Sequence, residues 1–184
     1  MVSTRWDDEL TELVTRRGRA LVGYGYALTG DVRRAEDLVQ DALVRVFRRF
    51  RRPEAAGTEG RTEFPLNDGG SHAGIEAYVR RTMLNLYLDE TRRFALWRKA
   101  QPKVAVEDRV KAPASDITAR ADVTAALRGL SPRQRACVVL RFYDDLTVPQ
   151  IAATLGIAQG TIKRHLADGI HALRGVLVPE GGLL

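Results

Sequence analysis

Apolar residues along most of the chain recur at intervals of three and four, the period of an amphipathic α-helix. The clearest case is one unbroken apolar stripe that begins at Ala35 and ends at Phe50. Its members are Ala35, Leu38, Val39, Ala42, Leu43, Val46, Phe47 and Phe50. The alternating pattern of half-buried strands is weak throughout the chain. The pattern therefore predicts an all-α protein.

The same period, together with signals for helix ends, predicts the remaining helices. The first helix is expected over residues 6–28, and Asp31 after it is a good N-cap for the striped helix. Its expected inner residues are Trp6, Leu10, Leu13, Val14, Leu21, Val22 and Tyr26. Further helices are expected over 75–100, 117–130, from Ser131 onward, 148–155 and 159–174.

The stretch LTVPQIAATLGIAQGTIKRHL, residues 146–166, has the spacing of a helix-turn-helix. Thr147 and Gln150 have capping-box spacing, and Gly156 stands where the first helix must end. Hydroxyl, amide and cationic side chains on the outer face of the second helix suit DNA phosphates and base edges. These residues are Gln159, Thr161, Lys163, Arg164 and His165. The alternative is a helical hairpin with a solvated basic face.

Two stretches lack the helical period. Residues 53–74 are rich in Gly, Pro and small polar residues, and we expect a disordered excursion over 53–65. The polar stretch after residue 100 predicts a flexible linker. The sequence thus predicts two small helical domains, residues 1–100 and 117–184, joined by a linker over 101–116.

Composition narrows the classes of function. The formal net charge of +6 favours an anionic partner, nucleic acid first. No run approaches the roughly 20 apolar residues of a membrane span, so no membrane insertion is expected. The charged N-terminus lacks a signal-peptide core, and the single Cys137 has no disulfide partner, which favours the cytoplasm. We find no metal-ligand spacing, no cofactor motif and no catalytic set, so an enzyme is not expected.

The stretch IEAYVRRTMLNLYLDETRRFALWRK, residues 75–99, interleaves arginines with aromatic residues. This pattern suits single-stranded nucleic acid, because cations follow the backbone while bases stack on rings. The alternative is purely structural: Tyr78 and Tyr87 belong to the hydrophobic core, and the arginines lie on the solvent-exposed face of the helix. For Trp97 the two interpretations remain equally open.

Three segments in the same order resemble an extracytoplasmic-function sigma factor of bacterial RNA polymerase, a member of the sigma-70 family. They are GDVRRAEDLVQDALVRVFRRF, AYVRRTMLNLYLDETRR, and LRGLSPRQRACVVLRFYDDLTVPQIAATLGIAQGTIKRHL. The resemblance implies two domains, region 2 and region 4, and a function in promoter-specific transcription initiation. The alternatives are a free-standing helix-turn-helix regulator and a module that docks on polymerase without initiating.

The resemblance also implies roles for individual residues. Region 2 would contact the β′ coiled coil of core polymerase through Asp37, Gln40 and Asp41. Its next helix would bind and melt the −10 element through Arg80, Arg81, Asn85, Asp89, Arg92, Arg93 and Trp97. The preceding loop would hold a flipped base near Asn67, Asp68, Ser71 and His72. Region 4 would read the −35 element and contact the β flap, and an anti-sigma factor is a further expected partner.

Overall fold

The computed structural model describes residues 5–51, 71–100 and 126–177, and within these ranges every regular element is a helix. The helices are α1 (Arg5–Thr29), α2 (Val32–Arg51), α3 (Ser71–Ala100), α5 (Pro132–Phe142), α6 (Val148–Leu155) and α7 (Gln159–Leu177). The predicted all-α class is confirmed. The expected linker over 101–116 and the excursion over 53–65 lie outside the described residues, as does most of the helix expected over 117–130.

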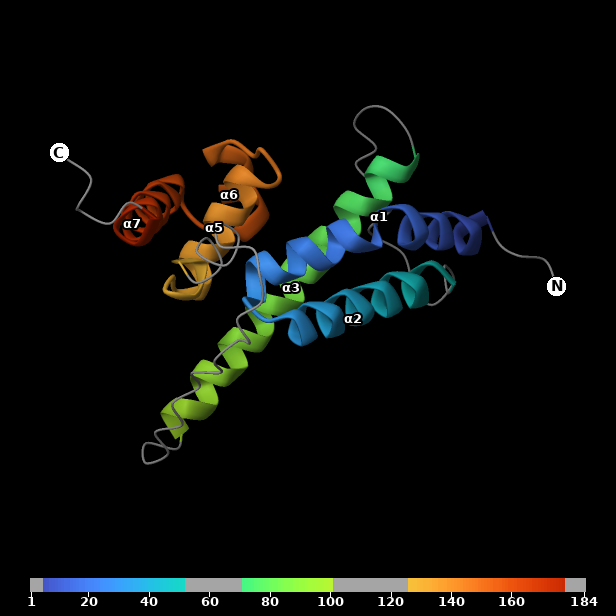
Figure 1. Cartoon of the computed structure of the whole chain (residues 1–184), viewed down its shortest axis with the longest axis horizontal. Helices are drawn as coiled ribbons and strands as arrows, with labels where there is room; N and C mark the ends of the chain where they lie inside the picture. The colour runs from blue at the N-terminus through green and yellow to red at the C-terminus, as the bar shows by residue number, and fades with distance from the viewer. Residues whose placement is uncertain (1–4, 52–70, 101–125, 178–184) are drawn as a thin grey trace.

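The first half of the molecule is a bundle of α1, α2 and α3 (Figure 1). The apolar stripe on α2 faces into this bundle, as predicted, with Ala35, Ala42 and Val46 almost fully buried. Helices α1 and α2 cross closely at Gly25, where an added Cβ would lie 3.1 Å from the carbonyl oxygen of Ala35. The stripe and this small residue together determine how α2 lies on α1.

The turn between α1 and α2 is set by local backbone chemistry. Gly30 adopts a φ of 72°, which a glycine reaches without strain, and its N–H donates to the Tyr26 carbonyl at 2.8 Å. The Asp31 carboxylate then accepts the backbone N–H of Arg34 at 2.9 Å. Asp31 therefore begins α2 as the predicted N-cap.

Helix α3 is longer than the sequence pattern predicted. It begins at Ser71 instead of Ile75, so it continues through Gly74. A glycine inside a helix costs only about 1 kcal/mol. Ile75 is buried to 2% exposure, and its packing supports the helix at that point. The opposite end of α3 extends away from the other helices, and residues 92–100 are exposed (Figure 1).

The second half contains α5, α6 and α7, with the predicted helix-turn-helix formed by α6 and α7. Ser131 and Gln134 form a complete capping box at the start of α5. At the start of α6, the backbone N–H and the hydroxyl of Thr147 both donate to the Gln150 side-chain oxygen at 2.8 Å. Gly156 ends α6 with a φ of 65°, as its position in the sequence predicted.

Helix α1 is buried on more sides than a simple amphipathic helix. Leu10, Leu13 and Leu21 are buried as predicted, but Val14 is 45% exposed and its assignment to the core was wrong. Tyr24 and Leu28 are fully buried and were not predicted. The reason is tertiary, because α5 packs against α1 and α3 and covers a second face of α1. Within the described ranges, no helix has the length and apolarity that a membrane span requires.

Candidate nucleic-acid interface

A polar groove of about 530 Å³ runs between α2 and α3. Arg45 and Arg49 line it from α2, and Asn85, Asp89 and Arg92 line it from α3. The three α3 residues were predicted from the sequence. The two α2 arginines were not, although their place off the apolar stripe was a signal that they face outward. Only the packing of α2 on α3 brings both sets to one groove.

The chemistry of this groove suits an unpaired nucleic-acid strand. Asn85 is exposed, and its amide can both donate to and accept from a base edge. Arg92 lies 3.8 Å from the Asp89 carboxylate in a loose, exposed pair that a phosphate can displace. The groove therefore offers cations for a backbone and an amide for a base. Thr154 and Leu155 of α6 also line it.

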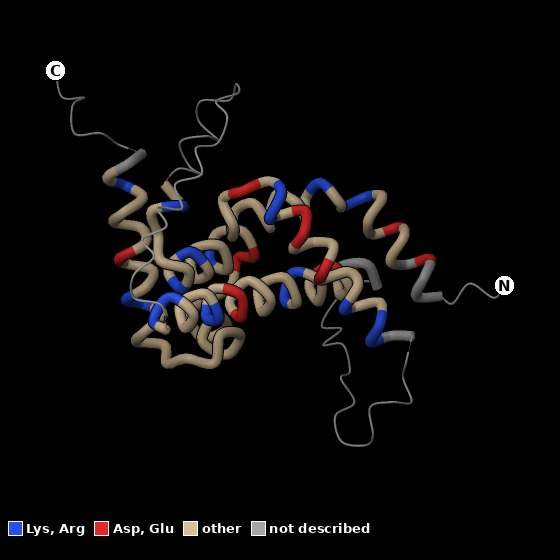
Figure 2. Tube along the Cα trace, turned by 90° about the horizontal axis from the view of Figure 1, so that it is seen from below, with Lys and Arg blue, Asp and Glu red and all other residues tan. Residues whose placement is uncertain are grey.

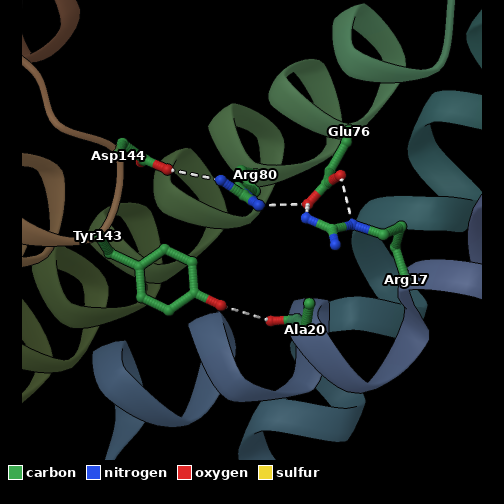
Figure 3. A network of polar contacts seen from close by, with 6 residues as sticks. All are labelled: Arg17, Ala20, Glu76, Arg80, Tyr143 and Asp144. Atoms are coloured by element: carbon green, nitrogen blue, oxygen red, sulfur yellow. Dashed lines mark hydrogen bonds and ion pairs between the residues drawn. The ribbon is translucent and has the colours of Figure 1, made fainter.

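Arg80 has a different setting from the other predicted phosphate ligands. One guanidinium nitrogen donates to Glu76 on its own helix, and the other donates to Asp144 between α5 and α6 at 2.9 Å (Figure 3). Arg17 of α1 also donates to Glu76 at 2.9 Å. The Arg80 side chain is only 18% exposed, while Arg81 and Arg93 are exposed as expected.

The network fixes the charge of Glu76. Burial by itself would raise the pKa of this carboxyl group, but the bonds from Arg17 and Arg80 outweigh it and lower the pKa below its usual value. Burial by itself would lower the pKa of Arg80, but its hydrogen bonds and charge interactions with Asp144 and Glu76 outweigh burial and raise that pKa. Both side chains are therefore charged at neutral pH.

The aromatic residues of α3 fall into two groups. Tyr87 is 3% exposed, so its assignment to the core is confirmed and it offers no ring for stacking. Tyr78 is half-buried and packs against the core. Phe94 and Trp97 are each 48% exposed, and their rings stack with centres 6.1 Å apart. The guanidinium of Arg98 lies 6.0 Å from the Phe94 ring, so the end of α3 combines exposed rings with cations.

Of the four residues expected to hold a flipped base, Ser71 and His72 fall within the described part of the chain. Asn67 and Asp68 lie outside the described residues. The backbones of Ser71 and His72 form the first turn of α3. Their role stays a prediction.

Two further faces carry predicted contacts. Asp37, Gln40 and Asp41 are exposed on α2, opposite its buried stripe. On α7, the exposed side chains include those of Gln159, Lys163 and Arg164. Ile162 and Leu166 anchor the same helix in the core.

Two other residues predicted on α7 are less exposed. Thr161 is half-buried. His165 is also half-buried, and burial followed by the nearby Arg164 lowers its pKa. This imidazole is therefore neutral at pH 7 and contributes no cation to the outer face.

Charged residues are distributed over both halves, with acidic positions among the basic ones (Figure 2). Among the described residues, no group of three His, Cys, Asp or Glu side chains could hold a metal ion. Cys137 is buried, and desolvation raises the pKa of its thiol to about 11.

Comparison with known families agrees with this geometry. Residues 13–58 match the model for Sigma-70 region 2, and residues 126–175 match the model for Sigma-70, region 4. The first match covers most of α1 and all of α2, and the second covers α5, α6 and most of α7.

The chain is also similar to individual proteins. It is 31% identical over 175 residues to the RNA polymerase sigma-E factor of Streptomyces coelicolor, covering 92% of this chain and 86% of that protein. It is 30% identical over 181 residues to the ECF RNA polymerase sigma factor SigE of Mycolicibacterium smegmatis, covering 94% of this chain but 61% of that protein. Among solved structures, the sigma factor RpoE of Bartonella quintana, crystallised with the anti-sigma factor NepR, has the same fold. That match has a TM-score of 0.65 at 22% identity and covers 97% of this chain and 100% of the other.

Proposed function

The chain belongs to the extracytoplasmic-function sigma factors of the sigma-70 family, which direct core RNA polymerase to specific promoters, and we propose that it divides this task among three surfaces. The groove between α2 and α3 binds the opened strand of the −10 element. The outer face of α7 reads the −35 duplex. The exposed face of α2 binds polymerase. We further propose that the protein acts in the cytoplasm, where RNA polymerase works.

The observation that carries this proposal is the groove itself. Asn85, Asp89 and Arg92 were expected to contact DNA, and they line one groove with two arginines from α2. An amide between cations fits a single strand, because the cations hold the backbone and the amide reads a base edge. Further along α3, the rings of Phe94 and Trp97 stack on each other and offer faces on which bases can stack.

The α7 surface supports the assignment of the −35 duplex. The N-terminal part of α7 presents Gln159, Lys163 and Arg164 to solvent, while the fully buried Ile162 anchors the helix in the core. In a helix-turn-helix, the N-terminal residues of the second helix contact base edges in the major groove. Amide and guanidinium groups suit adenine and guanine edges respectively. The neutral, half-buried His165 has at most a minor part in this contact.

The α2 surface supports the assignment of polymerase binding by its exposure and charge. Asp37 and Asp41 lie one turn apart on the exposed face, with Gln40 beside them. Carboxylates at this position would repel DNA, so a protein partner fits this face better. By the family resemblance, that partner is the β′ coiled coil, and the β flap contacts region 4. Regulation by an anti-sigma factor remains a further proposal.

In-vitro transcription with purified core polymerase and a library of genomic fragments tests the function. The chain should give discrete transcript start sites only when core enzyme is present. A free-standing regulator would instead protect DNA from nuclease by itself and would give no start sites with core enzyme.

Two double variants test the division of labour, and each serves as the control for the other. Asp37→Arg with Asp41→Arg should abolish binding to core enzyme. Lys163→Ala with Arg164→Ala should leave that binding unchanged and blur the −35 preference among the transcripts. Loss of core binding in both double variants would refute the division among surfaces.

A further inference from the structure

A second cavity, of about 1220 Å³, lies at the turn between α1 and α2. The C-terminal part of α3 and the residues around the start of α5 complete its lining. This is the part of α3 that extends away from the other helices (Figure 1). The cavity shares no lining residue with the groove between α2 and α3, so it is a separate feature of the surface.

Three arginines that are far apart in the sequence line this cavity. Arg34 belongs to the first turn of α2, Arg128 precedes α5, and Arg135 belongs to α5. The Arg128 side chain lies directly on Gly30, and its Nε donates to the Gly30 carbonyl at 2.7 Å. Arg135 is 8% exposed and donates to the Leu28 carbonyl at 2.8 Å, while its buried Nε has no hydrogen-bond partner among the described residues. Backbone carbonyls of the turn therefore hold two of the three cations in place.

The acidic residues of the lining compensate little of this charge. The Asp31 carboxylate accepts the backbone N–H of Arg34 at 2.9 Å as a helix cap. Glu90 pairs with the Arg34 guanidinium at 2.8 Å, but both side chains are about half exposed, so the pair is weak. In the described part of the chain, no carboxylate pairs with Arg128 or Arg135.

The three guanidinium groups are close enough to repel one another. Burial lowers the pKa of Arg135, Tyr87 raises it, and the like charges of Arg128 and Arg34 lower it again. A polyanion bound beside Arg34 and Arg128 would relieve this repulsion. Phosphate suits the position, because its oxygens match the fork of N–H donors on a guanidinium.

Another part of the lining is aromatic. Phe94 and Trp97 are each about half exposed, and their ring planes lie 25° apart with centres separated by 6.1 Å. The Arg98 guanidinium lies 6.0 Å from the Phe94 ring, and Arg93 and Lys99 add further exposed cations to the lining. Exposed rings of this kind stack on the flat face of a nucleobase. The cavity thus combines a site for phosphate with a site for a base.

We propose that this cavity binds a nucleoside polyphosphate, with its phosphates at Arg34 and Arg128 and its base on Phe94 and Trp97. Inorganic phosphate would use the arginines and leave the rings unused, whereas a neutral aromatic ligand would do the reverse. A nucleotide uses both, and the cavity exceeds the roughly 300 Å³ at which ligand sites begin. The phosphates displace Glu90 from Arg34. The inference goes beyond the proposed function, because no promoter or polymerase contact proposed above uses Arg34 or Arg128.

Isothermal titration calorimetry of the full chain tests the site with four probes: ATP, GTP, tripolyphosphate and adenosine. Physiological ionic strength limits unspecific binding to this basic protein. ATP and GTP should bind roughly tenfold more tightly than tripolyphosphate, because the base adds stacking. Adenosine should bind far more weakly than ATP, because it lacks the phosphates. Undetectable binding of ATP and GTP, or tripolyphosphate binding as tight as that of ATP, would overturn the proposal.

Two neighbouring apolar residues test the position of the base. Trp97→Ala should lower the affinity for ATP to roughly that for tripolyphosphate and leave the affinity for tripolyphosphate unchanged. Leu96→Ala is the matched control, because Leu96 is exposed on the same helix but does not line the cavity. Equal ATP affinities of the two variants would overturn the placement of the base.

Two neighbouring arginines test the position of the phosphates. Arg34→Gln should lower the affinities for ATP and tripolyphosphate alike, by roughly tenfold. Arg33→Gln makes the same change in net charge at an exposed residue outside the cavity and should lower them only slightly. Glu90→Gln should raise both affinities, because it removes the carboxylate that competes for Arg34. Equal losses with Arg33→Gln and Arg34→Gln would show that ATP binds through net charge alone, which would overturn the proposal.

The alternative occupant is a nucleic-acid strand, because Phe94 and Trp97 also belong to the proposed DNA surface. Fluorescence anisotropy with a labelled single-stranded oligonucleotide distinguishes the two. Arg92 lines only the other groove, so Arg92→Gln should weaken oligonucleotide binding and leave ATP binding unchanged. An unchanged oligonucleotide affinity with Arg92→Gln would refute the groove assignment and leave the nucleotide site standing. If Arg34→Gln weakens oligonucleotide binding while the wild type does not bind ATP, the cavity belongs to the DNA surface and the nucleotide proposal is overturned.

Discussion

Replacing Arg135 with methionine should destabilise the fold strongly, although no carboxylate pairs with this residue among the described contacts. Arg135 is 8% exposed and donates to the carbonyl oxygens of Leu28 at 2.8 Å, Arg128 at 3.0 Å and Leu130 at 3.3 Å. Its positive charge thus lies against the C-terminal end of α1, where the helix dipole is negative. The methionine side chain has similar length and fills much of the space without offering a donor.

The expected magnitude follows from these three bonds. Hydrogen bonds to a charged group contribute about 1.5–3 kcal/mol each, and buried carbonyls left without a donor add a penalty. Burying the charged guanidinium costs free energy, and the same burial lowers the pKa of Arg135. The methionine variant avoids this cost, which offsets part of the stability lost with the three hydrogen bonds. We expect a net loss of about 2–4 kcal/mol in the free energy of unfolding.

Urea unfolding followed by far-UV circular dichroism measures this loss as a lower midpoint at unchanged slope. Arg133→Met is the matched control, because Arg133 is exposed on the same helix, and it should change stability by no more than about 0.5 kcal/mol. Arg135→Lys should fall between the two, since a single ammonium nitrogen cannot reach three carbonyls as a guanidinium does. If Arg135→Met were no more destabilising than its control, the three carbonyl contacts would contribute nothing to stability.

Three other outcomes are expected. Gly25→Ala places a Cβ 3.1–3.2 Å from backbone atoms of Ala35 and should lower the thermal midpoint by the equivalent of about 1–3 kcal/mol. The control Gly18→Ala places its Cβ where no atom of another element lies within 4 Å, so it should raise the midpoint. A lower midpoint for both variants would contradict the steric argument. Because burial raises the pKa of Cys137 to about 11, its thiol should react with Ellman's reagent at pH 8 far more slowly in the native protein than in urea, and equal rates would show that it is accessible. Two arginines outweigh burial and lower the pKa of Glu76, so its carboxylate stabilises the fold above its ordinary pKa of 4.5, and this stabilisation is lost as the pH falls through the lowered pKa. Glu76→Gln should therefore be less stable than the wild type at pH 7, and the difference in stability should shrink below pH 4.5. A difference that stays constant with pH would refute the assignment.

The sequence by itself determined the local structure of this protein. The stripe on α2, the capping box at Ser131 and the left-handed Gly156 are each encoded within a few neighbouring residues. Such features depend on helical period and on backbone chemistry that acts over short distances, so they can be predicted without a partner element. The family resemblance rests on the same stretches and agrees with the matches to regions 2 and 4.

Only the tertiary structure decided which residues meet across elements. The pattern on α1 could not show that Tyr24 and Leu28 are buried, because the helix that covers them comes more than 100 positions later. It could not bring Arg45 to the groove of α3 either. Arg80 and Arg81 are equivalent in the sequence, yet one is held by Asp144 and the other faces solvent. Contacts of this kind depend on the relative placement of whole helices, which packing and charge pairing determine and which local periodicity does not record.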